Sequence, residues 1–162
     1  MKKLSLSSDI ISSADLRQVI AELEEFKKEF ARNALKARIG KPDKKVELEL
    51  SNHAKCLITD WQAGESLDLG LLESLLTELS RYLKTATLVK VTLSAVPTMN
   101  VKRIIADWFR TNIATSLLID FSYNSALLGG MAVSIGSHVY DWSFRRQIIG
   151  SKDKLIEVIT HV

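Results

Sequence analysis

The fold is decided by the stretch Leu127-Leu128-Gly129-Gly130-Met131-Ala132-Val133-Ser134-Ile135-Gly136-Ser137-His138-Val139-Tyr140-Asp141-Trp142-Ser143-Phe144-Arg145-Arg146-Gln147. Its pattern predicts a tight β-hairpin that leads into a helix. Met131, Val133 and Ile135 alternate with small residues, which places them on one face of a strand. Gly136-Ser137 suits a two-residue type II′ turn, with glycine at the first central position. Asp141 or Ser143 can cap the helix that follows.

A glycine pair opens this stretch. Gly129 and Gly130 supply backbone freedom that a residue with a Cβ atom lacks. Phosphate-binding loops need three spaced glycines, or Gly-x-x-x-x-Gly-Lys, between a strand and a helix. Here the glycines lie between a loop and a strand. We therefore interpret the pair as structural and not as a nucleotide site.

The segment before the hairpin predicts a compact β-α-β unit. Strands are expected over residues 88–95 and 117–121, which are rich in apolar and β-branched residues. Thr98 or Asn100 caps an expected helix over residues 101–113. The residues expected on its buried face are Ile104, Ile105, Trp108, Phe109 and Ile113. If the two strands are parallel, the crossover should be right-handed.

The first half of the chain predicts three amphipathic helices after a loose lead-in over residues 1–12. Ser13 is the expected N-cap of the first helix, which runs from about Ala14 to Arg38. Its apolar residues recur at alternating steps of three and four, as in a heptad seam. They are Leu16, Val19, Leu23, Phe26 and Phe30. We interpret this helix as one member of a bundle, with pairing to a partner's helix as the alternative.

The other two helices follow polar breaks. Residues 46–50 could form a short strand or the first turn of a helix through Trp61, and the helix is favoured. Beyond a glycine break, Ser66 or Asp68 caps a third helix that ends near Leu83. Its broad apolar face comprises Leu71, Leu72, Leu75, Leu76, Leu79, Tyr82 and Leu83.

A change of composition over residues 84–87 marks a boundary. The chain is therefore predicted to be an α+β protein. A helical region of about three helices covers residues 1–85. A small β-α-β-β-hairpin domain with a C-terminal helix covers residues 86–162, and residues 152–162 can form a last short helix.

Composition and charge narrow the function classes. The net charge is +3 and charges of both signs are mixed along the chain, whereas nucleic-acid binders concentrate Lys and Arg on one face. Cys56 is the single cysteine, which excludes an internal disulfide and favours a reducing compartment. The sequence has neither the apolar core of a signal peptide nor a run of about 18 apolar residues. We expect a cytoplasmic protein that only a partner would hold at a membrane.

The hairpin stretch resembles the C-terminal signature of the δ subunit of F-type ATP synthases, whose mitochondrial equivalent is the oligomycin sensitivity conferral protein. The matching pattern is Leu-x-Gly-Gly, a strand, a glycine turn and Asp-x-Ser-x-Arg. Upstream, Val91 to Ala95 resembles the family's strand that ends in Ser-Ala. The residues that carry the resemblance are Ser94, Ala95, Leu127, Gly129, Gly130, Gly136, Asp141, Ser143 and Arg145.

This resemblance implies a structural, non-catalytic subunit of the peripheral stalk, without cofactor or metal. Proteins of the family link the catalytic head of the proton-translocating synthase to its stalk and resist rotary torque. Their N-terminal part grips the N-terminal helices of the α subunits, and their C-terminal part holds the C-terminal helices of the b subunits. Contact with the membrane would then come only through the complex.

Candidate chemistry outside this resemblance is sparse. His53 and Cys56 are one helical turn apart, but a zinc site needs three or four ligands and the sequence has no second cluster. Cys56 is more simply a small buried hydrophobe. Trp142 could be a buried ring or a docking ring. Two alternatives stay open: a helix-binding adaptor unrelated to the synthase, and an enzyme with a site around Tyr140, Asp141, Trp142 and Arg145.

Overall fold

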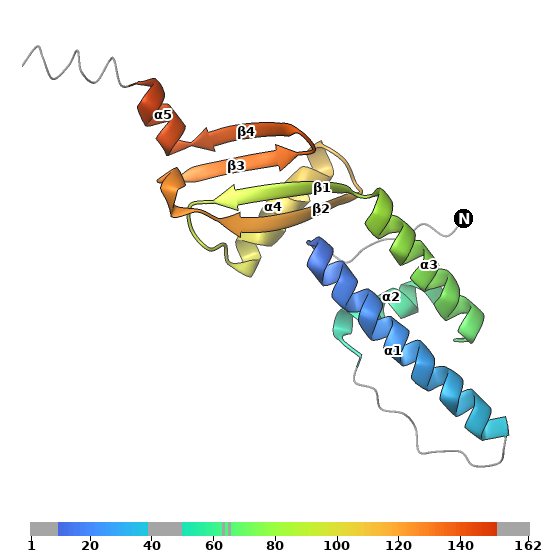
Figure 1. Cartoon of the computed structure of the whole chain (residues 1–162). Coiled ribbons are helices and arrows are strands. Elements are labelled where there is room, and N and C mark those ends of the chain that lie inside the picture. Colours follow the sequence, from blue (N-terminus) through green and yellow to red (C-terminus); the bar gives the residue numbers. More distant parts are fainter. Residues whose placement is uncertain (1–9, 39–49, 63, 65, 152–162) are drawn as a thin grey trace, which may run out of the picture. The chain divides into compact units, whose positions relative to one another are not determined.

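The computed structural model describes residues 10–38, 50–62, 64 and 66–151 (Figure 1). Over these residues the chain is a mixed α+β protein with five α-helices and a four-stranded mixed sheet, which confirms the predicted fold class. It divides into two compact units, Met1–Ala86 and Thr87–Val162. The predictions for residues 46–49 and 152–162 lie outside the described residues.

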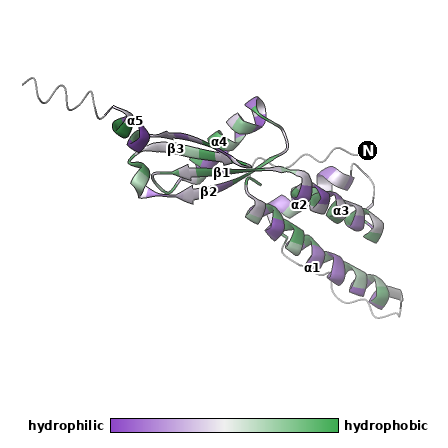
Figure 2. Ribbon diagram, turned by 45° about the horizontal axis from the view of Figure 1, so that its top comes forward, coloured by the Kyte–Doolittle hydropathy of each residue, from purple (hydrophilic) through white to green (hydrophobic). Residues whose placement is uncertain are grey.

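The first unit contains the helices α1 (Ser13–Arg38), α2 (Asn52–Gln62) and α3 (Leu69–Thr85). Helix α1 packs mainly along α3, and α2 contacts both (Figure 1). Leu16 and Leu23 of α1 are fully buried, as are three leucines at the centre of α3. Figure 2 shows how apolar and polar residues alternate along α1. The buried apolar residues of the three helices are Leu16, Val19, Leu23, Ala54, Leu57, Ile58, Trp61, Leu71, Leu72, Leu75 and Leu79.

The N-terminus of α1 differs from the prediction. Ser12, and not Ser13, is the cap: its Oγ accepts a hydrogen bond from Asp15 N at 3.1 Å, and the Asp15 carboxylate accepts one from Ser12 N at 2.9 Å. This reciprocal pair is a capping box in which Asp replaces the usual Glu or Gln. Ile10 and Ile11 are 1% exposed, so the expected loose lead-in does not extend to them. They are the first two residues described.

The caps of the other two helices fix where each begins. Ser51 caps α2 through a hydrogen bond from Ala54 N to its Oγ at 3.2 Å. Leu50 therefore precedes the helix and does not lie in its first turn. Of the two predicted caps for α3, Asp68 makes the bond, accepting from Leu71 N at 2.6 Å.

The second unit is a sheet in the order β2-β1-β3-β4. Strands β1 (Thr87–Leu93) and β2 (Leu117–Tyr123) are parallel and are joined through α4 (Met99–Asn112). Strands β3 (Gly130–Ile135) and β4 (His138–Ser143) form the predicted hairpin around Gly136-Ser137, and β3 pairs antiparallel with β1. A 3-10 turn (Ser125–Leu127) precedes β3, and α5 (Phe144–Gly150) follows β4.

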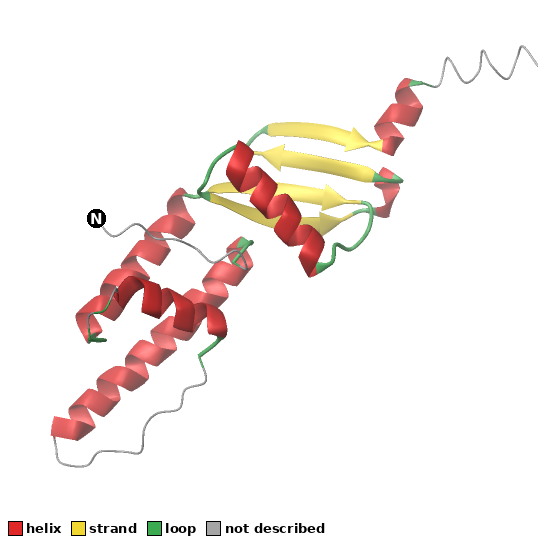
Figure 3. Ribbon diagram, turned by 180° about the vertical axis from the view of Figure 1, so that it is seen from behind, coloured by secondary structure: helices red, strands yellow, loops and turns green. Residues whose placement is uncertain are grey.

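Helix α4 covers one face of this sheet (Figure 3). Lys102 Nζ lies 5.9 Å from the centre of the Phe121 ring, and Phe121 pairs with Val91, which pairs with Val133. Because neighbouring residues in register share a face, α4 lies on the face that carries Val91 and Val133, both of which are buried. Ala106 and Phe109 are the buried residues of the helix.

The predicted buried face of α4 is wrong in large part. Of its five residues only Phe109 is buried, while Ile104, Trp108 and Ile113 are 61%, 56% and 50% exposed. The helix turns a narrower face to the sheet, centred on Ala106 and Phe109. The larger apolar side chains at positions 104 and 108 lie on the opposite side of the helix and face solvent.

Candidate interaction site

The glycine pair makes a sharp entry into the hairpin. Leu128, Gly129 and Gly130 have φ values of +61°, +146° and +74° in succession. A Cβ atom on Gly129 would collide with the Phe144 ring, and one on Gly130 would collide with the Trp142 carbonyl oxygen. Phe144 N also donates a hydrogen bond to the Gly129 oxygen at 3.1 Å. Because neither glycine has a Cβ atom, the start of β3 can pack directly against the end of β4 and the residue that follows it.

The Asp-x-Ser step completes the same junction. The Asp141 carboxylate accepts a hydrogen bond from Ser143 N at 2.8 Å, and Ser143 Oγ accepts one from Arg146 N at 3.3 Å. Ser143 is 1% exposed and is the N-cap of α5, which settles the choice between the two predicted caps. Hydrogen bonds from the side chain and the backbone of Ser143 lower the pKa of Asp141 below 3.8, and Arg146 and Arg145 lower it further.

The resemblance residues do not all lie at one place. Gly130 pairs with Ser143, and Leu93 pairs with Met131, so Ser94 and Ala95 follow β1 at the same end of the sheet as the glycine pair. These two residues form a bend after the strand and are not part of it. Gly136 lies at the opposite end, with φ +58° in the turn. Leu127 is half-buried, and Arg145 is exposed on α5.

Strand β4 presents an aromatic pair on the face that α4 covers. Tyr140 pairs with Val133 and Trp142 with Met131, which places both rings on that face. Their centroids are 5.9 Å apart and the rings are inclined by 14°. They are 47% and 52% exposed, because β4 is one of the two edge strands of the sheet. Trp142 is therefore a surface ring in this structure and not a core residue.

The geometry of β4 separates the residues of the predicted enzyme site. Tyr140 and Trp142 lie on one face of the strand and Asp141 on the other, because successive side chains alternate. The Asp141 carboxylate is engaged by Ser143, and Arg146 Nη1 donates to the Asp141 backbone oxygen at 3.3 Å. The side chains of this group do not converge on one reacting position.

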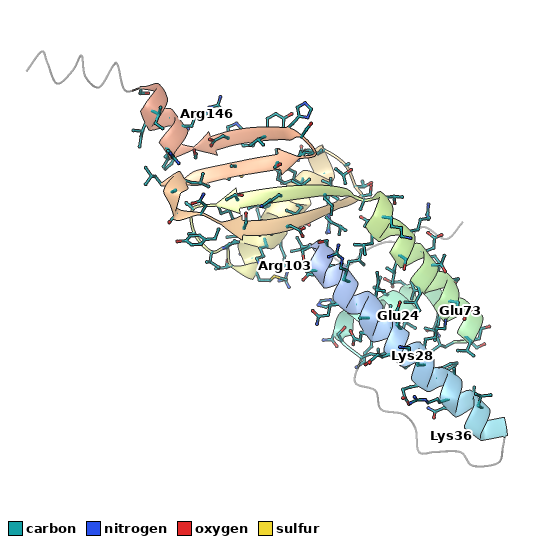
Figure 4. All side chains as sticks on the ribbon, in the orientation of Figure 1. Glu24, Lys28, Lys36, Glu73, Arg103 and Arg146 are labelled. Carbon is teal, nitrogen blue, oxygen red and sulfur yellow. The ribbon has the colours of Figure 1, made fainter. Side chains whose placement is uncertain are left out.

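A second candidate surface lies in the first unit. A cleft of about 770 Å³ runs between α1 and α3, and Figure 4 labels Glu24, Lys28 and Glu73 along it. Lys27 Nζ and Glu73 Oε1 form an ion pair across it at 2.9 Å. Eight of its nine lining residues have polar or charged side chains, and Leu76 is the exception. The lining residues are Glu24, Lys27, Lys28, Glu73, Leu76, Thr77, Ser80, Arg81 and Lys84.

The remaining sequence candidates have structural positions. Cys56 is exposed, so the prediction of a buried thiol is wrong. Within the described ranges, His, Cys, Asp and Glu side chains do not gather in groups of three that could hold a metal ion. Trp61 is buried, and its Nε1 donates to Ser74 Oγ at 3.0 Å between α2 and α3.

Comparison with known proteins found no match, either to a family model or to a curated protein. Across the part of the chain that the structure describes, no helix has both the length and the apolar character needed to cross a membrane.

Proposed function

We propose that this protein is a non-catalytic peripheral-stalk subunit of an F-type proton-translocating ATP synthase, joining the catalytic head to the b-subunit stalk. The observation that carries the proposal is the junction of the glycine pair with Asp-x-Ser. Gly130 faces the Trp142 carbonyl, and Asp141 and Ser143 hold the turn into α5. Four of the residues that carry the resemblance, Gly129, Gly130, Asp141 and Ser143, thus lie together at this junction and depend on one another for its backbone geometry.

The proposed work is mechanical and needs surfaces that accept helices. In the first unit, the cleft between α1 and α3 is the proposed site for an N-terminal helix of a synthase α subunit. Its mixed charges, including Lys28 and Glu73, would fix the orientation of that helix. The second unit would hold the C-terminal helices of the b subunits, and the protein would be cytoplasmic and reach the membrane only through the complex.

The test is purification of the tagged full-length protein from its own cells in mild detergent, with partners identified by mass spectrometry. The proposal expects synthase α, β and b subunits. Recovery of unrelated partners alone would refute it. A double variant that reverses a charge and fills the cleft, Lys28→Glu with Thr77→Trp, should lose the α and β subunits and keep b. Lys36→Glu is the matched control, because Lys36 is also an exposed lysine of α1 but lies outside the cleft lining; this variant should keep all three subunits.

A helix-binding adaptor unrelated to the synthase is the second candidate. The observation that favours it is the length of α1, which has 26 residues and whose Leu35 near the C-terminal end is 59% exposed. Leu35 lies outside the heptad register of Phe26 and Phe30, so a partner helix would contact it on a separate face of α1. If Leu35→Asp abolishes capture of every partner while the cleft variant changes nothing, the adaptor function is favoured over the stalk.

A further inference from the structure

Strand β4 lies at the edge of the described sheet, so one of its two sides has no strand beside it (Figure 1). The hydrogen bond from Phe144 N to the Gly129 oxygen shows which way the backbone groups point, because in antiparallel pairing they alternate between the two sides of a strand. The residues whose backbone groups point away from β3 are Val139, Asp141 and Ser143. We call these three residues the outer edge. Unpaired backbone groups on such an edge can add a strand of another chain.

The chain itself occupies part of the outer edge. The Asp141 backbone oxygen accepts a hydrogen bond from Arg146 Nη1 at 3.3 Å, and Ser143 N donates one to the Asp141 carboxylate at 2.8 Å. As the N-cap of α5, Ser143 also gives its backbone oxygen to the first turn of that helix. Among the described residues, the outward groups without a partner are the N–H and the oxygen of Val139 and the N–H of Asp141.

The side chains of β4 suit pairing with a second copy of the same strand. Val139 is 66% exposed, and the rings of Tyr140 and Trp142 are exposed as well. If two copies of β4 pair antiparallel about Tyr140, each Tyr140 lies opposite its counterpart, and aromatic cross-strand pairs are favourable. In this register Val139 of each copy lies opposite Asp141 of the other, and the two residues exchange hydrogen bonds. The Asp141 backbone oxygen is therefore a required acceptor.

We propose that Arg146 guards the outer edge: its guanidinium occupies the Asp141 backbone oxygen and thereby prevents a second copy of this chain from adding its own β4. An incoming strand would have to displace this charged side chain before Asp141 could accept its N–H. Charged side chains on edge strands are a known means of preventing such pairing. Figure 4 labels Arg146 where α5 follows β4. The inference goes beyond the stalk function, because it concerns the contact of the chain with itself.

The neighbouring arginine provides a matched control. Arg145 is also exposed and lies one position earlier in α5. Within the part of the chain that the structure describes, its side chain makes no hydrogen bond to β4, whereas that of Arg146 does. Replacing either arginine by alanine removes one positive charge. The two variants therefore differ in the guarding contact and not in net charge.

The test measures the sedimentation of the purified full-length protein and its variants over a range of concentrations. Arg146→Ala should form dimers with an association constant at least about tenfold above that of the parent, because two hydrogen bonds become possible, one from each Val139 N–H. Arg145→Ala should associate no more than the parent. Adding Val139→Pro to Arg146→Ala should reverse the association, because proline removes the required N–H and is tolerated on an edge strand.

An unchanged association constant for Arg146→Ala would overturn the proposal. Equal association of Arg145→Ala would do so as well, since it would assign the effect to net charge, and dimers that persist with Val139→Pro would place the contact away from the outer edge. Circular dichroism first shows that each variant is folded; if Arg146→Ala is not, Arg146→Met, which keeps the apolar stem without the donors, takes its place. Capture of synthase subunits tests the stalk function separately from these outcomes.

Discussion

The backbone carbonyl oxygen of Trp142 occupies the space that a Cβ atom on Gly130 would need. Gly130 also has a φ of +74°, a conformation that side-chain-bearing residues adopt only at a cost. Two independent constraints therefore act at this position, one from the local backbone and one from the neighbouring strand. Neither can be relieved by rotating a side chain, because the obstructing atom belongs to the backbone.

Gly130→Ala should consequently destabilise the second unit by more than about 2 kcal/mol, since left-handed strain and steric overlap add. Gly136→Ala is the matched control: Gly136 has φ +58°, and an added Cβ would meet no atom within 4 Å. It should cost only the strain, about 1–2 kcal/mol. Urea unfolding followed by hydrogen exchange of peptides from β3 and β4 measures both losses. Equal losses would mean that the Trp142 carbonyl moves aside freely.

Ser143→Ala should loosen the first turn of α5 and cost about 1 kcal/mol, because Arg146 N loses its hydrogen-bond acceptor. Asp141→Ala removes a different bond, the one that Ser143 N donates. Amide exchange of Arg146 should therefore accelerate in the Ser143 variant and stay close to the parent rate in the Asp141 variant. The reverse order would assign the cap to Asp141.

Asp141 should titrate below 3.8 in the folded protein, because hydrogen bonds from Ser143 favour its ionised form. A group whose pKa falls on folding stabilises the native state above its unfolded pKa, and that contribution disappears as the pH falls through the folded pKa. An NMR titration of the Asp141 carboxyl carbon measures the pKa directly. Ser143→Ala should raise the pKa of Asp141 more than Arg146→Gln does, because the side-chain hydrogen bond of Ser143 is the largest cause of its lowering and the charge of Arg146 a smaller one. A larger rise with Arg146→Gln would give the guanidinium the main role.

Local patterns predicted the hairpin well. The alternation of Met131, Val133 and Ile135 and the Gly136-Ser137 turn are decided by residues close in sequence, and the observed register follows them. The sequence predicts either Asp141 or Ser143 as the N-cap of α5, since either side chain can accept a hydrogen bond from a helix amide. The structure shows that the Asp141 carboxylate accepts a hydrogen bond from Ser143 N, whereas Ser143 Oγ accepts the one from the helix amide of Arg146.

Predictions that depended on the surroundings of a helix failed. Apolar residues occur on both sides of α4, and periodicity alone does not say which side meets the sheet. The sequence predicts that the larger side chains, Ile104 and Trp108, lie in the core, but the sheet packs against Ala106 and Phe109. Its residue type predicts a buried Cys56, but Cys56 lies on the exposed side of α2. Exposure of apolar residues is a tertiary property that the sequence does not carry locally.

The sequence also does not predict the contact between Glu22 and Ser51, because the two residues are 29 positions apart. The Glu22 carboxylate accepts hydrogen bonds from Ser51 N and, at 2.7 Å, from Ser51 Oγ. These two hydrogen bonds connect the start of α2 to the middle of α1. Hydrogen bonds to an ionised group contribute about 1.5–3 kcal/mol when both partners are held in place.

Glu22→Ala should therefore destabilise the first unit by about 1.5–3 kcal/mol and accelerate amide exchange at the start of α2. Glu22→Gln keeps an acceptor without the charge and should lose about half as much. Glu25→Ala, an exposed glutamate of the same helix, is the control and should change the free energy of unfolding by less than about 0.5 kcal/mol. Urea unfolding, followed by hydrogen exchange of peptides from α2, measures the free energy of unfolding of the three variants. If Glu22→Ala behaves like Glu25→Ala, the carboxylate contributes only surface charge, and α2 is held in place by its buried residues Ala54, Leu57, Ile58 and Trp61.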